Sequence, residues 1–380
     1  MPIDLLLIEE LLASESLWLQ SPRSLRNEAV AMVSAITQDL AAISSLNSAV
    51  LLSPASAASP FLQSLLPTTV RRCVTSREPG DWLRQPDLPL DSMHHLLIVA
   101  PEFDGILVNR LQAAENGPLS HARRLNLSSR LAAVFSDKFA TARWLEQHQL
   151  PTPKTWLASE ADRQQLTTLP ARPSEQRACH GVLKPRFGAG CDQVLLVPEL
   201  PAPSRLTDHP DIAPWVLQQR IRGRACSISL IGQGHCRPAL ILPPGRQRIK
   251  ADVDGRLHYH GGQFPCHPDV APVIVAVAEQ FRVAIGPFHG WLGLDVVVDS
   301  APSRAPTATI IEVNPRLCTS CIGYRQLTSE NLTHRMLFPE ASAEPVCWQT
   351  RTVRFAPGPH SMGSTACEKR APTVREADTQ

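Results

Sequence analysis

The chain has 380 residues and a formal net charge of +2 at pH 7, from 37 basic and 35 acidic residues. The two signs of charge are interspersed, so we expect neither nucleic acid nor another polyanion as a partner. No apolar run reaches the roughly 18 residues of a membrane span, and the acids in the first ten residues exclude a secretory signal peptide, so we expect a soluble, cytoplasmic protein without a membrane partner.

Short apolar runs alternate with a helical pattern over residues 1–125. Residues 5–8, 49–52 and 96–100 are expected to be buried strands, and residues 27–46 an amphipathic helix. This alternation predicts an open α/β domain.

Proline contributes 35 residues, nearly twice its usual share of about 5%. Because proline and its neighbours punctuate regular structure, residues 54–92 and 198–214 are expected to be loops. The composition of residues 339–380 turns to Pro, Ser, Ala, Thr and mixed charge, which predicts a Pro-rich, weakly ordered C-terminal tail after one short strand at 352–355.

A helix is predicted to begin at Lys138, since Ser136 or Asp137 can cap its N-terminus. Pro151 and Pro153 end the helical pattern. Beyond them the chain is expected to form strands at 181–185, 193–197, 215–221 and 225–232, and then a helix at 270–285.

The first of these strands ends at Lys184 and leads into a segment of small residues that contains Gly188 and Gly190. Backbone N–H groups in such a segment can approach phosphates closely, because glycine has no Cβ. Lys184 would place an ammonium group on the same phosphates. The segment is not a Walker A loop, which requires GxxxxGK[ST] before a helix, and an ordinary hairpin also fits it.

A third strand runs through Gln218 and Gln219 to Ile221 and then to a turn at Gly223. It can offer amide groups to the edge of an adenine while Ile221 packs on the ring. An ordinary edge strand would have the same pattern.

Two apolar runs, 291–298 and 309–313, are predicted strands of a hairpin that would bring Asp295 beside Glu312. Glu312 and Asn314 are two residues apart, so they share one face of their strand. Mg²⁺ prefers oxygen ligands, and Asp295, Glu312 and Asn314 supply them.

Arg316 follows this set and adds a planar donor fork for a phosphate or carboxylate. The alternative is that these acids are solvated strand ends. Their concentration within two otherwise apolar runs favours the magnesium site.

The order of these features resembles the ATP-grasp superfamily over residues 126–338. Residues 1–125 are similar to the pre-ATP-grasp α/β domain that commonly precedes it. The resemblance implies an α/β (α+β) fold in which two α+β subdomains clasp ATP. It also implies that Lys138 and Lys184 contact the ATP phosphates, that Gly188 and Gly190 close over them, and that the adenine lies against Gln218, Gln219 and Ile221, with Mg²⁺ (Mn²⁺ as a substitute) held by Asp295, Glu312 and Asn314.

Within the superfamily, the chain resembles the tyramine-glutamate ligases of methanofuran biosynthesis and their bacterial relatives. This likeness implies a carboxylate-amine ligase that works through an acyl phosphate, with small-molecule carboxylate and amine substrates and a homodimer as an allowed assembly. The segments that carry it are 24–32, 100–107, 259–262 and 314–323.

The resemblance also suggests catalytic residues, namely Arg316 with Arg248 and Lys250, two basic residues of what is expected to be a loop. Thr319, Ser320 and Tyr324 are candidates for the acceptor pocket.

One departure is that Gly223 is followed by Arg224, whereas many ATP-grasp proteins have an acid shortly after this glycine to hold the ribose. A ligase for other amino acids or peptides, and an ATP-binding protein without turnover, therefore remain alternatives.

Overall fold

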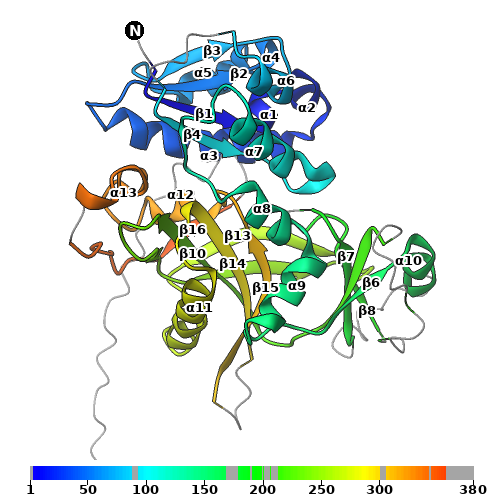
Figure 1. Ribbon diagram of the computed structural model, residues 1–380. Coiled ribbons are helices and arrows are strands. Elements are labelled where there is room, and N and C mark those ends of the chain that lie inside the picture. Colours follow the sequence, from blue (N-terminus) through cyan, green and yellow to red (C-terminus); the bar gives the residue numbers. More distant parts are fainter. Residues whose placement is uncertain are drawn as a thin grey trace, which may run out of the picture.

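The protein is mixed α/β, as the sequence predicts, and the described residues form three sheets (Figure 1). In a computed structural model, no helix of the described residues is long and apolar enough to cross a membrane. The described residues are 3–87, 93–167, 179–188, 191–198, 200, 206, 213–299, 305–341 and 344–356.

The first sheet is parallel throughout and has the strand order β3-β2-β1-β4-β5. The predicted strands at 5–8, 49–52 and 96–100 are confirmed as β1, β2 and β4, and their apolar side chains are buried on both faces of the sheet. The strands are β1 (Leu5–Glu9), β2 (Ser48–Leu52), β3 (Arg71–Val74), β4 (His95–Val99) and β5 (Arg123–Arg124).

Helix α3 (Arg23–Ala41) packs on one face of this sheet, and α6 (Pro79–Arg84) and α7 (Ile106–Asn116) pack on the other. The predicted helix at 27–46 is confirmed, although it begins and ends about one turn earlier. Two short helices, α1 (Glu10–Ala13) and α2 (Glu15–Gln20), follow β1.

The expectation that residues 54–92 form a loop is wrong for the described part of that range. Strand β3 lies there, together with α4 (Pro54–Ala57), α5 (Pro60–Leu65) and α6. Each of these three helices has its proline in the first turn, where a missing N–H costs nothing and the fixed φ suits a helix. The prolines therefore start helices here.

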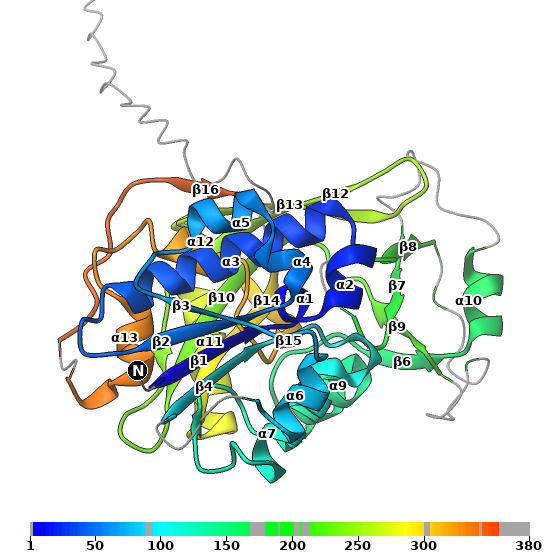
Figure 2. The same ribbon diagram turned by 90° about the horizontal axis from the view of Figure 1, so that it is seen from above.

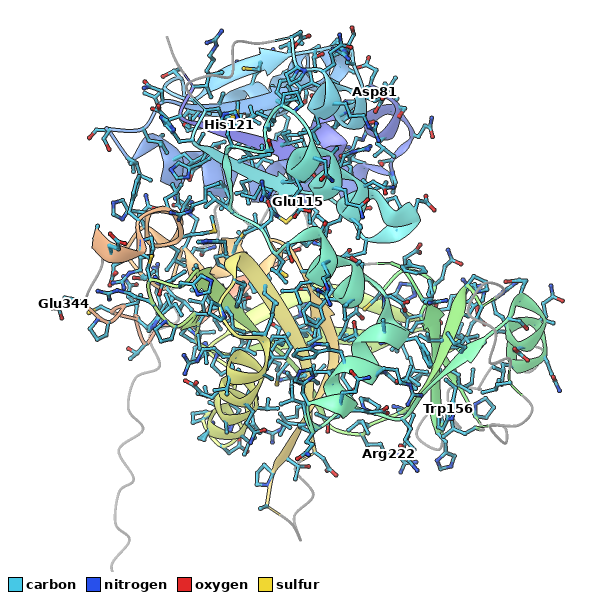
Figure 3. All side chains as sticks on the ribbon, viewed as in Figure 1. Asp81, Glu115, His121, Trp156, Arg222 and Glu344 are labelled. Carbon is cyan, nitrogen blue, oxygen red and sulfur yellow. The ribbon has the colours of Figure 1, made fainter. Side chains whose placement is uncertain are left out.

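Two helices connect the first sheet to the rest of the molecule: α8 (Ser129–Ser136) and α9 (Lys138–Gln147). Glu115 of α7 lies at this junction (Figure 3) and accepts a hydrogen bond of 2.8 Å from the backbone N–H of Ser129. The predicted start of α9 at Lys138 is confirmed, and Asp137 is its N-cap. A 3-10 helix, η1 (Phe103–Gly105), precedes α7.

The second sheet is small and antiparallel, with the order β6-β9-β7-β8, and α10 (Glu160–Thr167) follows its first strand. It lies to one side of the molecule in both views (Figure 2). Its strands are β6 (Thr155–Ala158), β7 (Gly181–Pro185), β8 (Leu195–Val197) and β9 (Trp215–Gln219).

The third sheet is antiparallel, and α11 (Ala271–Ile285) covers the face that carries the apolar residues of β10 and β14. Its path is β15-β14-β10-β12-β13-β16, with β11 beside β10. Its strands are β10 (Arg224–Gln233), β11 (Leu240–Ile241), β12 (Gly245–Ala251), β13 (Leu257–Phe264), β14 (His289–Asp299), β15 (Thr307–Asn314) and β16 (Val353–Phe355).

The C-terminal part of the described chain returns to the first sheet through α12 (Ser320–Tyr324) and α13 (Leu332–Leu337). Both helices contact α3, and one apolar cluster continues from α3 to the third sheet. The 3-10 helix η5 (Pro339–Ala341) and β16, which pairs with β13, continue past residue 339. Thus the predicted strand at 352–355 is present, and residues 357–380 of the predicted tail lie outside the described chain.

Candidate active site

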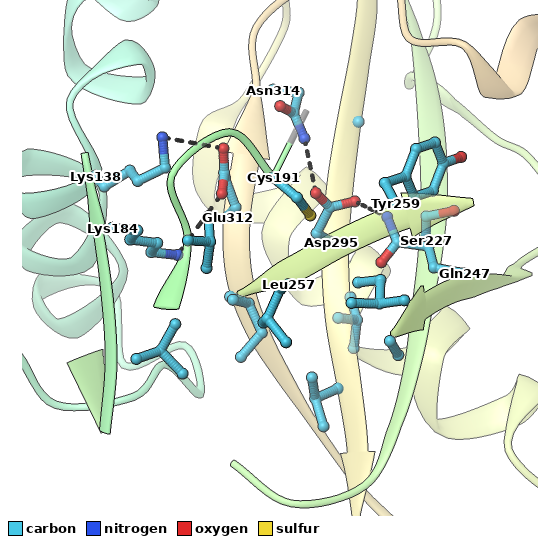
Figure 4. Close-up of a pocket in the computed structure, with 18 of the residues that line it drawn as sticks. Lys138, Lys184, Cys191, Ser227, Gln247, Leu257, Tyr259, Asp295, Glu312 and Asn314 are labelled. Atoms are coloured by element: carbon cyan, nitrogen blue, oxygen red, sulfur yellow. Dashed lines mark hydrogen bonds and ion pairs between the residues drawn. The ribbon is translucent and has the colours of Figure 1, made fainter. Parts of the chain in front are cut away.

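A cavity of about 670 Å³ lies where the second and third sheets meet (Figure 4). The second sheet contributes Lys184 and Gln218, and the third contributes the alternate residues Ala225, Ser227 and Ser229 of β10. The intervening residues of β10 face α11, as the alternation of a strand requires. Helix α3, which packs on the first sheet, reaches the same cavity through Glu28.

Two lysines converge on Glu312 in this cavity (Figure 4). Lys138 Nζ lies 3.3 Å from Glu312 Oε1, and Lys184 Nζ lies 3.6 Å from Oε2. Burial alone would raise the pKa of Glu312, but the two ammonium groups outweigh it and lower the pKa. Burial lowers the pKa of Lys184, and Glu312 opposes that change.

The position of Lys138 is fixed by the N-terminus of α9. The Asp137 carboxylate accepts hydrogen bonds from the N–H groups of Phe139 and Ala140, which makes it the cap. It also accepts two hydrogen bonds from the Arg186 guanidinium, at 3.0 and 2.6 Å. One carboxylate therefore ties α9 to the segment that follows β7.

Asp295 lies opposite Glu312 in the β14–β15 register, so the predicted hairpin is confirmed. It accepts hydrogen bonds from Gln247 Nε2 at 2.7 Å and from Asn314 Nδ2 at 3.2 Å. Burial, and then repulsion from Glu312, raises the pKa of Asp295 to about 7.

This donor set fits a divalent cation. Two carboxylates repel each other at this point, and Asn314, whose Nδ2 is turned to Asp295, keeps its amide oxygen for another partner. Carboxylate and amide oxygens are the ligands that Mg²⁺ prefers. Within the described ranges, no group of three or more His, Cys, Asp or Glu side chains is arranged for a metal, so a zinc-type cluster is not part of this site.

The end of the cavity near the second sheet carries Gln218, Gln219 and Ile221. Gln218 is buried, and its Nε2 donates to Thr155 Oγ1 at 3.1 Å. Gly188 lines the cavity and its carbonyl accepts a hydrogen bond of 2.7 Å from Lys138 Nζ. Gly190 lies outside the described residues.

Gly223, at the turn after β9, is required by close packing. A Cβ placed there would lie 2.2 Å from the carbonyl oxygen of Val298. Arg224, at the position after it, lines the cavity and forms an ion pair of 3.0 Å with Asp269. The position directly after Gly223, close to where many ATP-grasp proteins have an acid, therefore carries a cation in this chain.

The other end of the cavity carries Arg316, Thr319 and Ser320. Arg316 Nε donates to Glu102 Oε1, in the segment between β4 and η1, at 2.9 Å. Ser320 Oγ lies 3.2 Å from Ser229 Oγ.

Three residues predicted for the site do not line the cavity. The segment with Arg248 and Lys250 is strand β12 rather than a loop, and both side chains are exposed. Tyr324 is fully buried, and its hydroxyl donates to the carbonyl of Pro243 at 2.9 Å, so it belongs to the core.

Sequence reasoning missed Gln247, Tyr259 and Glu28, which do line the cavity. Recognition of β12 as a strand would have placed Gln247 and Arg248 on opposite faces. Glu28 and Tyr259 lie in two of the segments that carry the family resemblance, 24–32 and 259–262, but no local pattern in those segments places either side chain in the cavity.

The comparisons with known proteins concern the family and the fold. Residues 135–320 match the family model of an ATP-grasp domain. The fold is similar to that of an ATP-grasp superfamily protein from Archaeoglobus fulgidus, with 20% identity, a TM-score of 0.61 and coverage of 88% of each chain. No match was found among curated proteins.

Two further solved structures are similar in fold. The L-amino acid ligase from Bacillus licheniformis is 19% identical, with a TM-score of 0.54 over 89% of this chain and 74% of that one. The biotin carboxylase domain of the Hydrogenobacter thermophilus 2-oxoglutarate carboxylase, solved with MgADP, is 9% identical, with a TM-score of 0.61 over 92% of this chain and 73% of that one.

Proposed function

We propose, from the match of residues 135–320 to the family model of an ATP-grasp domain, that the protein is an ADP-forming ligase that joins a carboxylate to an amine. The observation that carries the proposal is the convergence of Lys138 and Lys184 on Glu312, beside Asp295, in one cavity that also contains Arg316. Such a site places cations around a polyphosphate and acids around its metal.

The proposed chemistry has two steps. A carboxylate oxygen attacks the γ-phosphorus of ATP, the bond to the β-phosphate oxygen breaks, and ADP leaves. The amine nitrogen then attacks the acyl carbon and loses a proton, and inorganic phosphate leaves with the electron pair of the broken C–O bond. Neither step requires a nucleophilic side chain of the protein, such as that of a Ser-His-Asp or Cys-His set.

The chain's own residues supply positioning and charge neutralisation. Lys138 and Lys184 are proposed to contact the ATP phosphates, with Gly188 beside them, and Gln218, Gln219 and Ile221 to hold the adenine. Asp295, Glu312 and Asn314 would hold Mg²⁺, or Mn²⁺ in its place. The ion would neutralise the charge that develops on the transferred phosphoryl group.

Arg316 is proposed to stabilise the acyl phosphate from the end of the cavity opposite to the proposed adenine site. Its Nε is held by Glu102, which fixes the plane of the guanidinium. Thr319 and Ser320 lie at the same end of the cavity and are candidates for contacts with the substrates. Arg248, Lys250 and Tyr324 have no role in this proposal.

For the substrates, we propose glutamate and an amine such as tyramine, in methanofuran-type coenzyme biosynthesis linked to one-carbon metabolism. The support is the likeness of four sequence segments to the tyramine-glutamate ligases. An amino-acid or peptide ligase for other substrates is the second candidate, and the similar fold of an L-amino acid ligase favours it.

The test is to incubate purified protein with MgATP and a matrix of amino acids and amines, and to measure ADP and phosphate. Turnover that requires both an acid and an amine supports the ligase. ATP binding without turnover on any pair would favour a binding protein, for which the missing acid after Gly223 is the argument. Release of AMP would exclude the acyl phosphate.

A further inference from the structure

The register of the third sheet orders the cavity from one end to the other. Along β10, Ala225 pairs with Val297, Ser227 with Asp295 and Ser229 with Gly293. All six residues line the cavity. Four residues of strand separate its two ends, a distance of about 13 Å.

The proposed nucleotide occupies the end at Val297. The adenine segment, Gln218 to Gly223, runs directly into β10 at Arg224, which pairs with Val298. Asp295 and Glu312 lie in the middle, where the transferred phosphoryl group would be. An amine must therefore approach the acyl carbon from the end at Gly293 and Ser229.

Helix α3 contributes one side chain to that end. Glu28 projects from α3 into the cavity, and Thr319 Oγ1 donates a hydrogen bond to its Oε1. Thr319 precedes Ser320, which contacts Ser229. The carboxylate of Glu28 thus lies at the end where the amine must enter.

Glu28 differs from the other acids nearby in its ion pairing. Glu312 is paired with two lysines, and Glu102 with Arg316. No Lys, Arg or His in the described part of the chain forms an ion pair with Glu28. The charge of Glu28 acts on the Arg316 guanidinium, but Arg316 forms its ion pair with Glu102. A half-buried carboxylate that faces a cavity and is not taken up in an ion pair favours a cationic ligand.

Tyr259 of β13 also lines the cavity. Burial, and then the charges of Asp295 and Glu28, raises the pKa of its phenol, so the hydroxyl stays neutral. Figure 4 shows its side chain near Ser227 and Gln247. An aromatic ring beside a carboxylate is a favourable environment for an ammonium group.

We propose that Glu28 binds the ammonium group of the amine substrate, so that the acceptor is a cationic primary amine held between α3 and the third sheet. This inference rests on the proposed ligase function. It assigns amine selection to the first domain, and phosphoryl transfer to the ATP-grasp domain.

The test compares two nucleophiles in wild type and Glu28→Gln. With glutamate and MgATP, tyramine is a cation near neutral pH, whereas hydroxylamine is uncharged and traps an acyl phosphate as a hydroxamate. We expect Glu28→Gln to raise KM for tyramine about ten- to hundred-fold, because a charge-assisted hydrogen bond is lost. Hydroxamate formation and KM for ATP should stay within about two-fold of wild type.

Glu279→Gln is the matched control, because Glu279 is exposed on α11 away from the cavity. An unchanged KM for tyramine in Glu28→Gln would overturn the proposal. Equal loss of tyramine and hydroxylamine turnover would also overturn it, since that pattern shows a role in acyl phosphate formation or in folding.

A binding measurement separates this inference from the proposed function. Wild-type protein loaded with MgADP should bind tyramine at least about ten times more tightly than its uncharged analogue 4-ethylphenol, and Glu28→Gln should abolish the difference. Equal affinities in the wild type would refute the ammonium site even if turnover is found. Selective tyramine binding with no turnover on any pair would refute the ligase and leave the ammonium site intact.

Discussion

Glu312 is the residue on which the charges of the cavity converge. Its two oxygens face Lys138 and Lys184 separately, so a neutral amide cannot satisfy both ammonium groups. We expect Glu312→Gln to lower kcat at least about 100-fold, a typical loss for removal of one stabilising group in an active site. ADP release with saturating substrates measures the effect. Near-normal turnover would exclude Glu312 as a metal ligand.

Gln247 acts on the same site through Asp295. Its amide donates a hydrogen bond of 2.7 Å that orients the carboxylate, and loss of such a partner typically weakens metal binding about ten- to hundred-fold. We therefore expect Gln247→Ala to raise the Mg²⁺ concentration needed for half-maximal ATP binding by about this factor. The exposed Gln112 supplies the control, Gln112→Ala. An unchanged Mg²⁺ requirement would show that Asp295 is oriented without Gln247.

Glu9, at the end of β1, predicts a pH dependence of stability. Burial raises the pKa of Glu9 to about 8, whereas the unfolded chain has the ordinary value. The folded state therefore holds the proton of Glu9 more tightly than the unfolded chain does. The stability that this proton contributes is complete below the unfolded pKa and is lost as the pH rises through about 8. Glu9→Gln keeps an oxygen to accept from the Leu12 N–H without a charge to bury.

The free energy of unfolding in urea should fall from pH 5 to pH 8 by on the order of 1 kcal/mol per unit in the wild type, and more gently in Glu9→Gln. Parallel curves for the two proteins would show that Glu9 is not the titrating group.

At the scale of elements, the start of α9 combines a cap with an ion pair. Asp137→Ala removes both, whereas Ser128→Ala at the start of α8 removes a cap alone. We expect losses of about 1 kcal/mol for Ser128→Ala and about 3 kcal/mol for Asp137→Ala. Only Asp137→Ala should also weaken ATP binding, since Lys138 follows the cap. Equal effects in thermal unfolding would mean that the Arg186 pair contributes nothing.

Helices and strands were predicted correctly where the signal, an apolar run or a helix cap, lies within the segment itself. β1, β2, β4, α9 and α11 all lie where the sequence predicts them, because burial on both faces or a capped amphipathic stripe leaves a clear pattern. The helices in residues 54–87 were not predicted, since proline both breaks a helix and starts one. Pro243 and Pro244 directly precede β12, and they made that strand look like part of a loop.

At the scale of the whole molecule, Asp39 of α3 joins the layer on the first sheet to the C-terminal helices of the described chain. Asp39 Oδ1 lies 2.5 Å from Arg325 Nε, and Thr333 Oγ1 donates to Oδ2 at 2.8 Å. Removal of one partner from a buried pair typically costs 3–5 kcal/mol, so we expect Asp39→Ala to lower the free energy of unfolding by about 3 kcal/mol.

Thr333→Val removes a single hydrogen bond and should cost about 1 kcal/mol. Equal losses in the two variants, measured by denaturant unfolding, would show that the Arg325 pair adds no stability to the contact between α3 and the C-terminal helices. Because Glu28 lies on the same helix, Asp39→Ala should also weaken binding of tyramine more than binding of ATP.

The sequence by itself predicted that the proposed metal ligands would lie side by side on one hairpin. Asp295, Glu312 and Asn314 lie on two strands of one hairpin, and strand alternation is a local rule that any register must obey. Only the tertiary structure placed Gln247 on Asp295, Arg316 on Glu102, and Glu28 at the end of the cavity. Gln247 and Asp295 are 48 residues apart in the sequence, and Glu102 and Arg316 are 214 apart. Contacts over such separations depend on how the sheets and α3 pack, which no local pattern encodes.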